Sequence, residues 1–208
     1  MKVILVNGSP HEHGCTYTAL REAAAQLEAA GIGAEFFWLG DAQIRGCTGC
    51  GGCAKTGRCI YADRVNEFVA LAPSADGFIF GSPVHFAGAS GAMTSFMDRV
   101  FFILGGADAL RLKPAAVVVS ARRAGTTSAF DQLMKYPTYA QMLYVGSRYW
   151  PMVHGSTPDE VRQDAEGMQV MRVLGRNMAW LLKTLRAGEA AGISAPEQEN
   201  KVRTNFIR

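Results

Sequence analysis

The sequence predicts an α/β protein in which a doubly wound parallel sheet of five strands lies between two layers of helices. Three observations support this three-layer fold class. Short apolar runs alternate with longer segments of helical periodicity, the runs are continuous, and polar loops that contain glycine follow several of them. Continuous apolar runs are typical of strands buried on both faces, and their alternation with helices indicates parallel pairing.

Each expected strand is a short apolar run bounded by polar or turn-forming residues. The five runs are residues 2–7, 34–39, 77–81, 114–120 and 142–145. In a doubly wound sheet, ligands bind outside the carboxyl ends of the strands, where the strand order reverses. The loops after the first, third and fourth strands are therefore the places where we expect the function to lie.

Helical periodicity follows the strands. Leu20 and Leu27 share one face of the first expected helix, and Asp63 is a typical cap for the second. Thr157 caps a last helix whose first turn contains Pro158. Apolar stripes mark a helix through Met93, Met97, Val100 and Leu104, a helix from about Thr127 to about Pro137, and the last helix through Met171, Leu174, Met178, Leu181, Leu182 and Leu185.

Length and composition indicate one folded domain. The 208 residues are 49% hydrophobic and 19% charged, which is too apolar for a disordered chain. We expect a single domain over residues 1–187 with a cysteine-rich insertion at 46–60, followed by a C-terminal tail at 188–208. The net charge of +3 comes from scattered residues, so the sequence predicts no nucleic-acid partner.

Apolar runs of membrane-spanning length are not expected. The run Val3–Val6 is too short for a signal-peptide core, and Phe68–Met93 is interrupted by Pro73, Asp76 and Pro83. The sequence therefore predicts a cytoplasmic protein without a membrane partner. In that compartment thiols stay reduced, so clustered cysteines favour metal binding or redox chemistry over a disulfide framework.

The first loop, residues 8–16, joins a buried strand to a helix. Free N–H groups and the positive end of the helix make such a loop suitable for a phosphate monoester. Neither the P-loop pattern nor the dinucleotide-binding glycine pattern is present. The candidate binding residues are Ser9, Pro10, His11, Gly14, Cys15 and Thr16. A plain turn and a metal site on His11, His13 and Cys15 are the alternatives, and Cys15 alone is typical of a small buried residue.

The second loop, residues 82–91, and the third loop, residues 120–126, follow the third and fourth strands. Small residues let a flat ring approach the backbone of the second loop, whose candidate residues are Pro83, Val84, His85 and Phe86. The third loop adds two guanidinium groups, and its candidate residues are Ser120, Arg122, Arg123 and Gly125. A strand end interrupted by proline and a solvated arginine pair are the alternatives.

The cysteine segment, residues 46–60, carries four of the five cysteines at the spacing C-x2-C-x2-C-x5-C, namely Cys47, Cys50, Cys53 and Cys59. Closely spaced thiolates can converge on a compact centre, and the intervening glycines permit the tight turns that this requires. The run differs from a ferredoxin motif in its last gap and in having Ile60 in place of proline. Structural zinc and free or partly oxidised thiols remain alternatives.

Several motifs, in this order, resemble the flavodoxin-like NAD(P)H-dependent FMN reductase family. They are Gly8-Ser9-Pro10, Gly14-Cys15-Thr16, Gly81-Ser82-Pro83-Val84-His85-Phe86 and Phe96-Met97-Asp98-Arg99. Residues 145–150 resemble the iron–sulfur flavoprotein branch of that family. The cysteine run is similar to that of the iron–sulfur flavoprotein branch. Two positions depart from the family pattern: Cys15 stands where Asn is common, and His85 where Tyr is usual.

The resemblance implies strand order 2-1-3-4-5 and an FMN cofactor. It places the phosphate on Ser9, His11, Cys15 and Thr16, and the ring against residues 83–86 and 120–125. It also implies a 4Fe-4S cluster on the four cysteines. A homodimer or homotetramer is a further implication, in which Tyr149 and Trp150 complete a neighbour's pocket.

The expected function is therefore that of an FMN-dependent oxidoreductase with NAD(P)H as co-substrate. The flavin supplies the chemistry, so no side chain is expected to act as acid or base in the hydride step. Arg122 or Arg123 can favour the anionic reduced ring. The acceptor is expected to be a quinone, flavin, nitro compound or protein. A non-enzymatic FMN/iron–sulfur electron carrier and a zinc-stabilised binding module are the alternatives.

Overall fold

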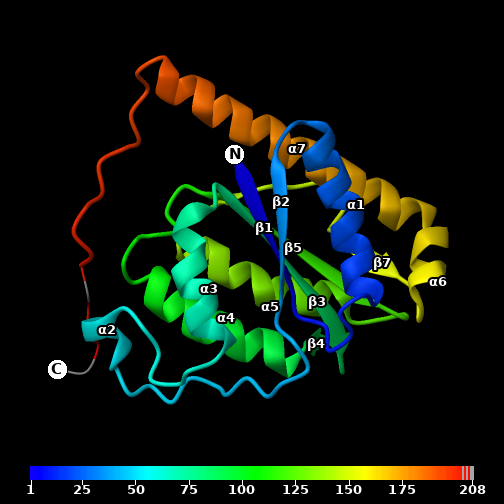
Figure 1. Cartoon of the computed structure of the whole chain (residues 1–208), viewed down its shortest axis with the longest axis horizontal. Coiled ribbons are helices and arrows are strands. Elements are labelled where there is room, and N and C mark those ends of the chain that lie inside the picture. The colour runs from blue at the N-terminus through cyan, green and yellow to red at the C-terminus, as the bar shows by residue number, and fades with distance from the viewer. Residues whose placement is uncertain (203, 205, 207–208) are drawn as a thin grey trace.

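The computed structural model describes residues 1–202, 204 and 206 and has three layers, with a twisted sheet in the middle (Figure 1). Five strands run parallel in the order β2-β1-β3-β5-β6. They are β1 (Lys2–Asn7), β2 (Gly33–Trp38), β3 (Gly77–His85), β5 (Pro114–Ala121) and β6 (Leu143–Tyr144). Numbered along the chain, these five strands have the predicted order 2-1-3-4-5, which confirms the fold class.

The two faces of the sheet carry different helices. On one face lie α1 (Cys15–Ala29) and α7 (Ala165–Ala190); on the other lie α3 (Arg64–Leu71), α4 (Gly91–Leu104) and α5 (Thr126–Tyr139). Alternate residues of β1 enter the two cores: Val3 and Leu5 pack toward α1 and α7, and Ile4 and Val6 toward α3, α4 and α5. Both faces of the central strands are therefore buried, which explains their continuous apolar sequence.

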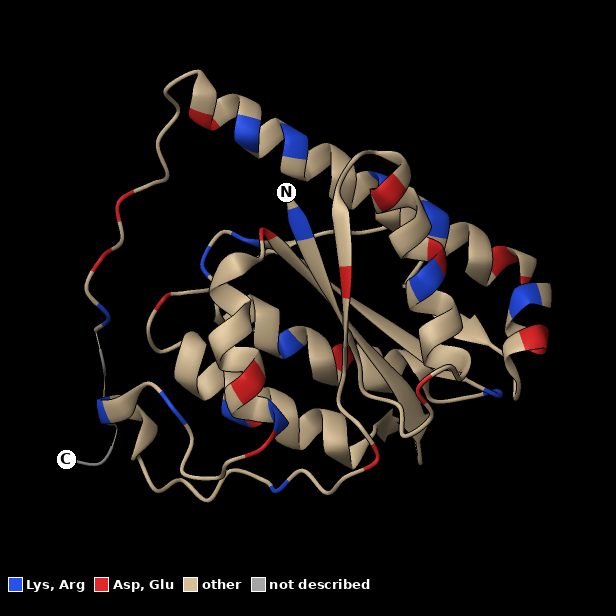
Figure 2. Ribbon diagram, viewed as in Figure 1, with Lys and Arg blue, Asp and Glu red and all other residues tan. Residues whose placement is uncertain are grey.

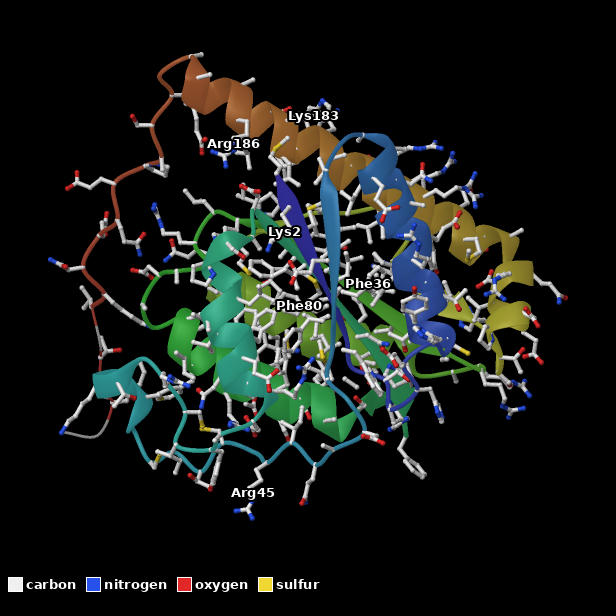
Figure 3. All side chains as sticks on the ribbon, viewed as in Figure 1. Lys2, Phe36, Arg45, Phe80, Lys183 and Arg186 are labelled. Carbon is white, nitrogen blue, oxygen red and sulfur yellow. The ribbon has the colours of Figure 1, made fainter. Side chains whose placement is uncertain are left out.

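Aromatic rings fill the core beneath α3 and α4. Phe68 on α3 contacts four other phenylalanines with ring centroids 5.1–6.5 Å apart: Phe37, Phe78, Phe80 and Phe96. Phe80 lies in this interior, whereas Arg45, which directly precedes the cysteine segment, lies at the exposed surface (Figure 3). Lysines and arginines are interspersed with acidic residues over the helices and loops (Figure 2).

Two short strands were not predicted. Strand β4 (Gly88–Ala89) pairs antiparallel with the end of β3, so residues 82–85 of the expected second loop belong to an extended β3 and a β3–β4 hairpin. Strand β7 (Met152–His154) pairs with the last part of β5, and β6 pairs with its first part. Strand β6 is shorter than the predicted 142–145. Pairs of two or three residues are too short to leave a periodic signal in the sequence.

The prediction of one continuous last helix was wrong. Thr157 does cap a helix, because the N–H of Glu160 donates to its Oγ1 at 3.2 Å, but this helix, α6 (Pro158–Gln163), ends before Asp164. Asp164 then caps α7: its Oδ1 accepts from the N–H of Gly167 at 2.9 Å, and its Oδ2 from the N–H of His154 at 2.7 Å. The break therefore depends on a contact with β7, which lies outside the helix on the other side of α6.

Helix α7 continues to Ala190, beyond the expected start of the tail at residue 188. The exposed segment after it contacts the domain where Arg111 donates to the carbonyl of Pro196 at 2.7 Å. Of the helices that the structure describes, none is long and apolar enough to cross a membrane.

Candidate functional site

The sheet register brings the three predicted loops to one edge. Asn7 at the end of β1 lies opposite Gly81, and Pro83 lies opposite Ser120 at the end of β5. The N–H of Gly8 donates to the carbonyl of Gly81 at 2.8 Å. The first loop therefore leaves the sheet directly beside the strand that carries the second.

The first loop folds around the side chain of Asn7. The Oδ1 of Asn7 accepts from the N–H of Ser9 at 3.1 Å, and the Nδ2 of Asn7 donates to the carbonyl of Glu12 at 2.9 Å. The hydroxyl oxygen of Ser9 accepts from the N–H of His11 at 3.1 Å, and the indole N–H of Trp38 donates to the Ser9 carbonyl at 2.8 Å. The loop is thus held in shape by its own residues and by its neighbours in the sheet.

Helix α1 begins at the end of this loop without a side-chain cap. Gly14 is the N-cap, its backbone is extended, and within the described chain no side chain accepts from the first turn. A Cβ at Gly14 would lie 3.0 Å from the Cβ of His11, so the loop turns tightly there. Uncapped N–H groups at the positive end of a 15-residue helix attract an anion.

Two residues of this turn connect it to the far side of the sheet. The hydroxyls of Thr16 and Ser120 lie 2.8 Å apart, and both side chains are buried. The thiol of Cys15 donates to the carbonyl of Gly155 at 3.6 Å. Burial raises the pKa of Cys15, so the group stays a thiol at neutral pH. Either hydroxyl can be the donor in the Thr16–Ser120 hydrogen bond, and the backbone N–H of Thr16 lies in the first turn of α1.

The β3–β4 hairpin and the third loop touch each other. Gly125 has φ +93°, and a Cβ there would lie 2.6 Å from the Cα of Ala87 and 3.0 Å from Val84. The hydroxyl of Ser128 donates to the carbonyl of Ala87 at 2.6 Å. Phe86, at the tip, has φ +49° and a fully exposed ring.

The remaining predicted residues of these loops differ in exposure. Ser9 is buried and Pro83 and Val84 are half-buried, whereas five side chains are exposed: Pro10, His11, His85, Arg122 and Arg123. Sequence reasoning missed Asn7, Trp38 and Ser90, whose Oγ donates to the carbonyl of Gly8 at 3.0 Å. The polar Asn7 at the end of an apolar strand is the one signal that was available.

The cysteine segment forms an extended stretch along one side of the molecule and a short helix, α2 (Cys53–Thr56), before α3 (Figure 1). Its four cysteines line one small pocket, together with Tyr61, Arg99, Phe102 and Ile103. Cys47 and Cys50 are exposed, whereas Cys53 and Cys59 are partly buried against the core. Gly49, Gly51 and Gly57 have φ between +65° and +70°, as tight turns between ligands require.

The donor set of this pocket fits a thiolate-bound metal centre. The four thiols are free, and the described residues that line the pocket include no carboxylate or imidazole. Soft sulfur ligands favour iron–sulfur clusters, zinc or copper(I). Burial, together with the nearby thiols of Cys59, Cys47 and Cys50, raises the pKa of Cys53. Among the described residues, no three potential ligands are yet close enough together to hold a metal ion.

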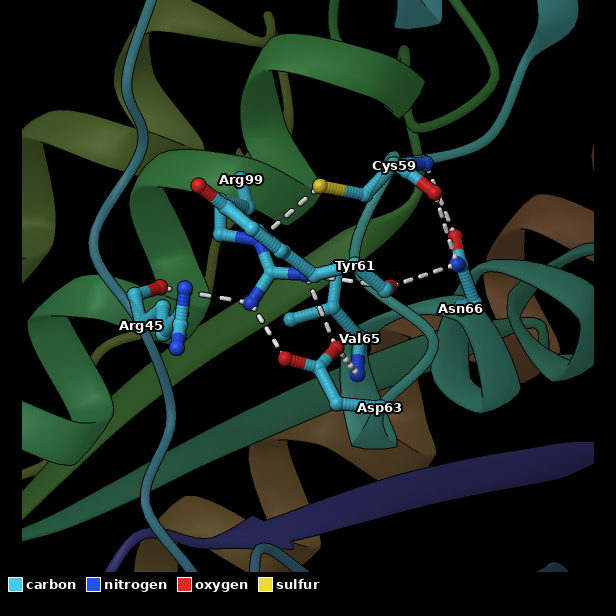
Figure 4. Close-up of polar contacts among 7 residues, drawn as sticks. All are labelled: Arg45, Cys59, Tyr61, Asp63, Val65, Asn66 and Arg99. Carbon is cyan, nitrogen blue, oxygen red and sulfur yellow. Dashed lines mark hydrogen bonds and ion pairs between the residues drawn. The ribbon is translucent and has the colours of Figure 1, made fainter.

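A buried arginine contacts both ends of the cysteine segment (Figure 4). Arg99 on α4 is 1% exposed, and its NH1 and NH2 donate to Oδ2 and Oδ1 of Asp63 at 2.6 and 2.8 Å. NH1 also donates to the carbonyl of Arg45 at 3.2 Å, and NH2 to that of Tyr61 at 3.4 Å. Its Nε donates to the sulfur of Cys59 at 3.2 Å. Burial lowers the pKa of Arg99, but the hydrogen bonds to Asp63 and Cys59 outweigh this effect and raise it overall.

A family model and curated relatives of this chain point to the same family. The model of the family described as NADPH-dependent FMN reductase matches residues 1–157. An iron-sulfur flavoprotein of Methanocaldococcus jannaschii is 33% identical over an alignment of 193 residues, and the match covers 89% of this chain and 100% of that protein. One from Archaeoglobus fulgidus is 25% identical over 195 residues, covering 88% of this chain and 98% of that one.

Solved structures share the fold at low sequence identity. RosB with a bound 8-demethyl-8-formylriboflavin-5'-phosphate has a TM-score of 0.69 and 13% identity, covering 100% of this chain and 92% of that one. A flavodoxin from the domain Archaea has a TM-score of 0.60 and 15% identity, covering 88% and 99%. The flavodoxin-like fold and the resemblance noted in the sequence are both confirmed. The chain belongs to the NADPH-dependent FMN reductase family, in the branch whose curated members are named iron-sulfur flavoproteins.

Proposed function

We propose that this protein is an FMN-dependent oxidoreductase that accepts reducing equivalents from NAD(P)H and passes them to a second molecule. The observation that carries the proposal is the uncapped N-terminus of α1, which hydrogen bonds connect to the ends of β3 and β5. An anion site and two ring-sized loops thus meet at one sheet edge, where doubly wound sheets bind their ligands. Membership of the FMN reductase family supports FMN as that ligand.

The first loop binds the phosphate in this proposal. The backbone N–H groups of Cys15 and Thr16 donate to the phosphate oxygens from the first turn of α1. The oxygen of the Ser9 hydroxyl already accepts from His11, so the Ser9 proton is available for a phosphate oxygen. The exposed imidazole of His11 adds a further donor. Pro10 and Gly14 shape the loop around the phosphate.

The second and third loops bind the ring. Residues 83–86 and 120–125 supply backbone N–H groups and apolar surface, and the exposed Arg122 and Arg123 supply positive charge that favours an anionic ring. When bound, FMN supplies hydride-accepting and single-electron chemistry. The residues of this chain orient the ring and restrict the access of water to it.

We assign the four cysteines as ligands of a 4Fe-4S cluster, which supplies single-electron transfer when bound. Their shared pocket and all-sulfur donor set support this assignment, as do the names of the relatives. The proposed acceptor is a quinone, a free flavin, a nitro compound or an electron-transfer protein. FMN and a 4Fe-4S cluster together suit the transfer of electrons from NAD(P)H, a two-electron donor, to an acceptor that takes one electron at a time.

We further propose that the protein works in the cytoplasm as a homodimer or homotetramer, without a nucleic-acid or membrane partner. Tyr149 and Trp150 support the oligomer, because both rings are about half exposed and pack edge to face with centroids 4.8 Å apart. Exposed aromatic pairs are typical of contact surfaces between subunits.

A spectrum of the protein purified without oxygen tests these assignments together. We expect flavin absorption, FMN released on denaturation, a broad iron–sulfur absorption, and iron and sulfide in equal amounts. Added NADH or NADPH should bleach the flavin band. A colourless protein that takes up no added FMN would contradict the proposal.

Two other results would replace parts of the proposal. FMN that NADH and NADPH do not reduce would identify an electron carrier rather than a reductase. Zinc without iron or sulfide would identify a zinc-stabilised module at the cysteine segment. Size-exclusion chromatography with light scattering tests the oligomer, and a monomer would contradict it.

A further inference from the structure

Arg99 uses every one of its N–H groups. Two bind Asp63, one binds the carbonyl of Arg45 and one that of Tyr61, which leaves the Nε–H directed at the sulfur of Cys59. Among the described residues, Arg99 has the largest fully buried side chain. A buried charge requires a counter-charge and complete hydrogen bonding, and Asp63 with the two carbonyls provides most of this.

The acceptor of the fifth hydrogen bond is the unusual part of this arrangement. A neutral thiol is a weak acceptor, so it is a poor partner for a buried cationic donor. A sulfur that carries negative charge, as a metal ligand does, is a strong acceptor of a charge-assisted hydrogen bond. The Nε–H of Arg99 at 3.2 Å from Cys59 is therefore suited to a metal-bound sulfur at that position.

Cys59 is also held more firmly than the other three cysteines. Its N–H donates to Oδ1 of Asn66 at 2.8 Å, and its carbonyl accepts from Nδ2 of Asn66 at 2.9 Å. Cys47 and Cys50 are exposed, and the sulfur of Cys47 accepts from the N–H of Gly49 in the same turn at 3.5 Å. One ligand is thus fixed to α3 and α4, while two lie on an exposed stretch.

We propose that Arg99 is a positioning residue for the cysteine centre. It fixes the sulfur of Cys59 and, through its Nε–H and its positive charge, raises the reduction potential of the cluster that the cysteines hold. The inference rests on the proposed function, in which the four cysteines bind a 4Fe-4S cluster. Reduction adds negative charge to the cluster, and hydrogen bonds to its sulfurs favour that state. Asp63 partly cancels the Arg99 charge and so lowers the potential.

The two members of the ion pair should therefore shift the potential in opposite directions. Arg99→Lys keeps the charge but loses the planar fork, so it cannot bind Asp63 and Cys59 together. Asp63→Asn keeps an acceptor for the N–H of Val65, and Asn is a good helix cap, so α3 should persist. A purely structural role would not give shifts of opposite sign.

The experiment is a potentiometric titration of the anaerobically purified protein, with the cluster followed by electron paramagnetic resonance. We expect Arg99→Lys to lower the equilibrium constant for one-electron reduction about tenfold, which is about 59 mV. Asp63→Asn should raise it several-fold. Lys55→Gln is the matched control, because it removes an exposed cation from the cysteine segment itself and should leave the constant within about twofold through solvent screening.

A second measurement needs no cluster. Amide hydrogen exchange of the metal-free protein should become about tenfold faster at residues 58–63 in Arg99→Lys, and stay unchanged at residues 8–16. Equal shifts of potential in all three variants, or shifts of the same sign for Arg99→Lys and Asp63→Asn, would overturn the role in setting the potential. Unchanged exchange at residues 58–63 would overturn the positioning role.

Failure of the role in setting the potential and failure of the positioning role can each be distinguished from failure of the proposed function. If the wild-type protein binds no iron or sulfide, the cluster assignment fails and the role in setting the potential falls with it. The exchange measurement still decides whether Arg99 fixes Cys59. Circular dichroism and retained FMN verify that each variant is folded.

Discussion

The first loop and the cysteine segment are both long connections next to strand ends, but the protein holds them by different means. The first loop joins β1 directly to α1, and Asn7, Ser9 and Trp38 fix its backbone before any ligand binds. The cysteine segment lies between β2 and α3, and the buried Arg99 and Asn66 hold it near its end. The first loop is preorganised, whereas the four thiols of the cysteine segment share a pocket in which, among the described residues, no three potential ligands lie close enough to hold a metal ion.

This difference follows from what each site is proposed to bind. A phosphate monoester is recognised by N–H groups that a helix terminus provides without a ligand. A metal centre supplies its own binding energy, and that energy can order the residues that hold it. The sequence can therefore specify a rigid loop for one cofactor and a largely exposed loop for the other.

The largest effect is expected from removing Asp63, the counter-charge of the buried Arg99. Asp63→Ala leaves Arg99 buried without its partner and should lower the free energy of unfolding by about 3–5 kcal/mol. Urea unfolding of the purified protein measures this. Asp159→Ala is the control, because Asp159 and Arg162 form an exposed ion pair and the loss should stay below about 1 kcal/mol. An equal loss of unfolding free energy in the two variants would mean that the buried Arg99–Asp63 pair holds the cysteine segment no better than an exposed ion pair would.

The next effect tests the first loop. Ser9→Asp places a carboxylate where the phosphate is proposed to bind, and FMN affinity should fall at least about a hundredfold, or about 3 kcal/mol, because two anions repel there. Fluorescence titration of the flavin-free protein with FMN measures it. Ser194→Asp makes the same change on the exposed segment after α7 and should leave the affinity unchanged. An unaltered affinity in Ser9→Asp would argue against phosphate binding at this loop.

The sequence identified the five principal strands because each is buried on both faces and therefore continuously apolar. It also identified Asp63 and Thr157 as caps, since a cap is local to its helix. The break at Asp164 was missed because His154, which holds it, lies on β7, a strand of three residues. Local periodicity has no information on such contacts.

The candidate site shows the same limit. The first loop could be located from its position after a strand, and the cysteines from their spacing. Arg99 was noted only within a motif, because its partners Cys59 and Asp63 are 40 and 36 residues away. A cation on the apolar stripe between Phe96 and Ile103 is the signal that points to a buried ion pair.

Removing the metal gives a smaller effect that is confined to one region. A chelator under anaerobic conditions should speed amide exchange across residues 46–56 several-fold, because the exposed cysteines lose the centre that orders them. Residues 8–16 should keep their protection, and the FMN content should not change. Loss of FMN together with iron would show that the two regions are coupled, which the present geometry does not predict.

The smallest effect concerns the groove beside the cysteine segment, where Tyr136 on α5 lines the same cavity as Cys53. The Tyr136 hydroxyl donates to Asp98 on α4 at 2.5 Å, and burial together with that carboxylate raises the pKa of Tyr136 above its ordinary value. The folded state then holds the proton more tightly than the unfolded state does. The contribution of Tyr136 to stability is therefore full below the unfolded pKa of about 10 and is lost as the pH rises toward the folded value.

Tyr136→Phe isolates this contribution. At about pH 8, below the ordinary tyrosine pKa of about 10, the variant should be less stable by about 0.5–1.5 kcal/mol, the net value of one hydrogen bond. At about pH 11 the difference between the two proteins should shrink, because unfolding of the wild type then releases a proton. Urea unfolding at both pH values measures it. A difference that grows with pH would mean that the hydroxyl ionises more readily in the folded protein, and that Asp98 does not hold its proton as the short contact between α4 and α5 indicates.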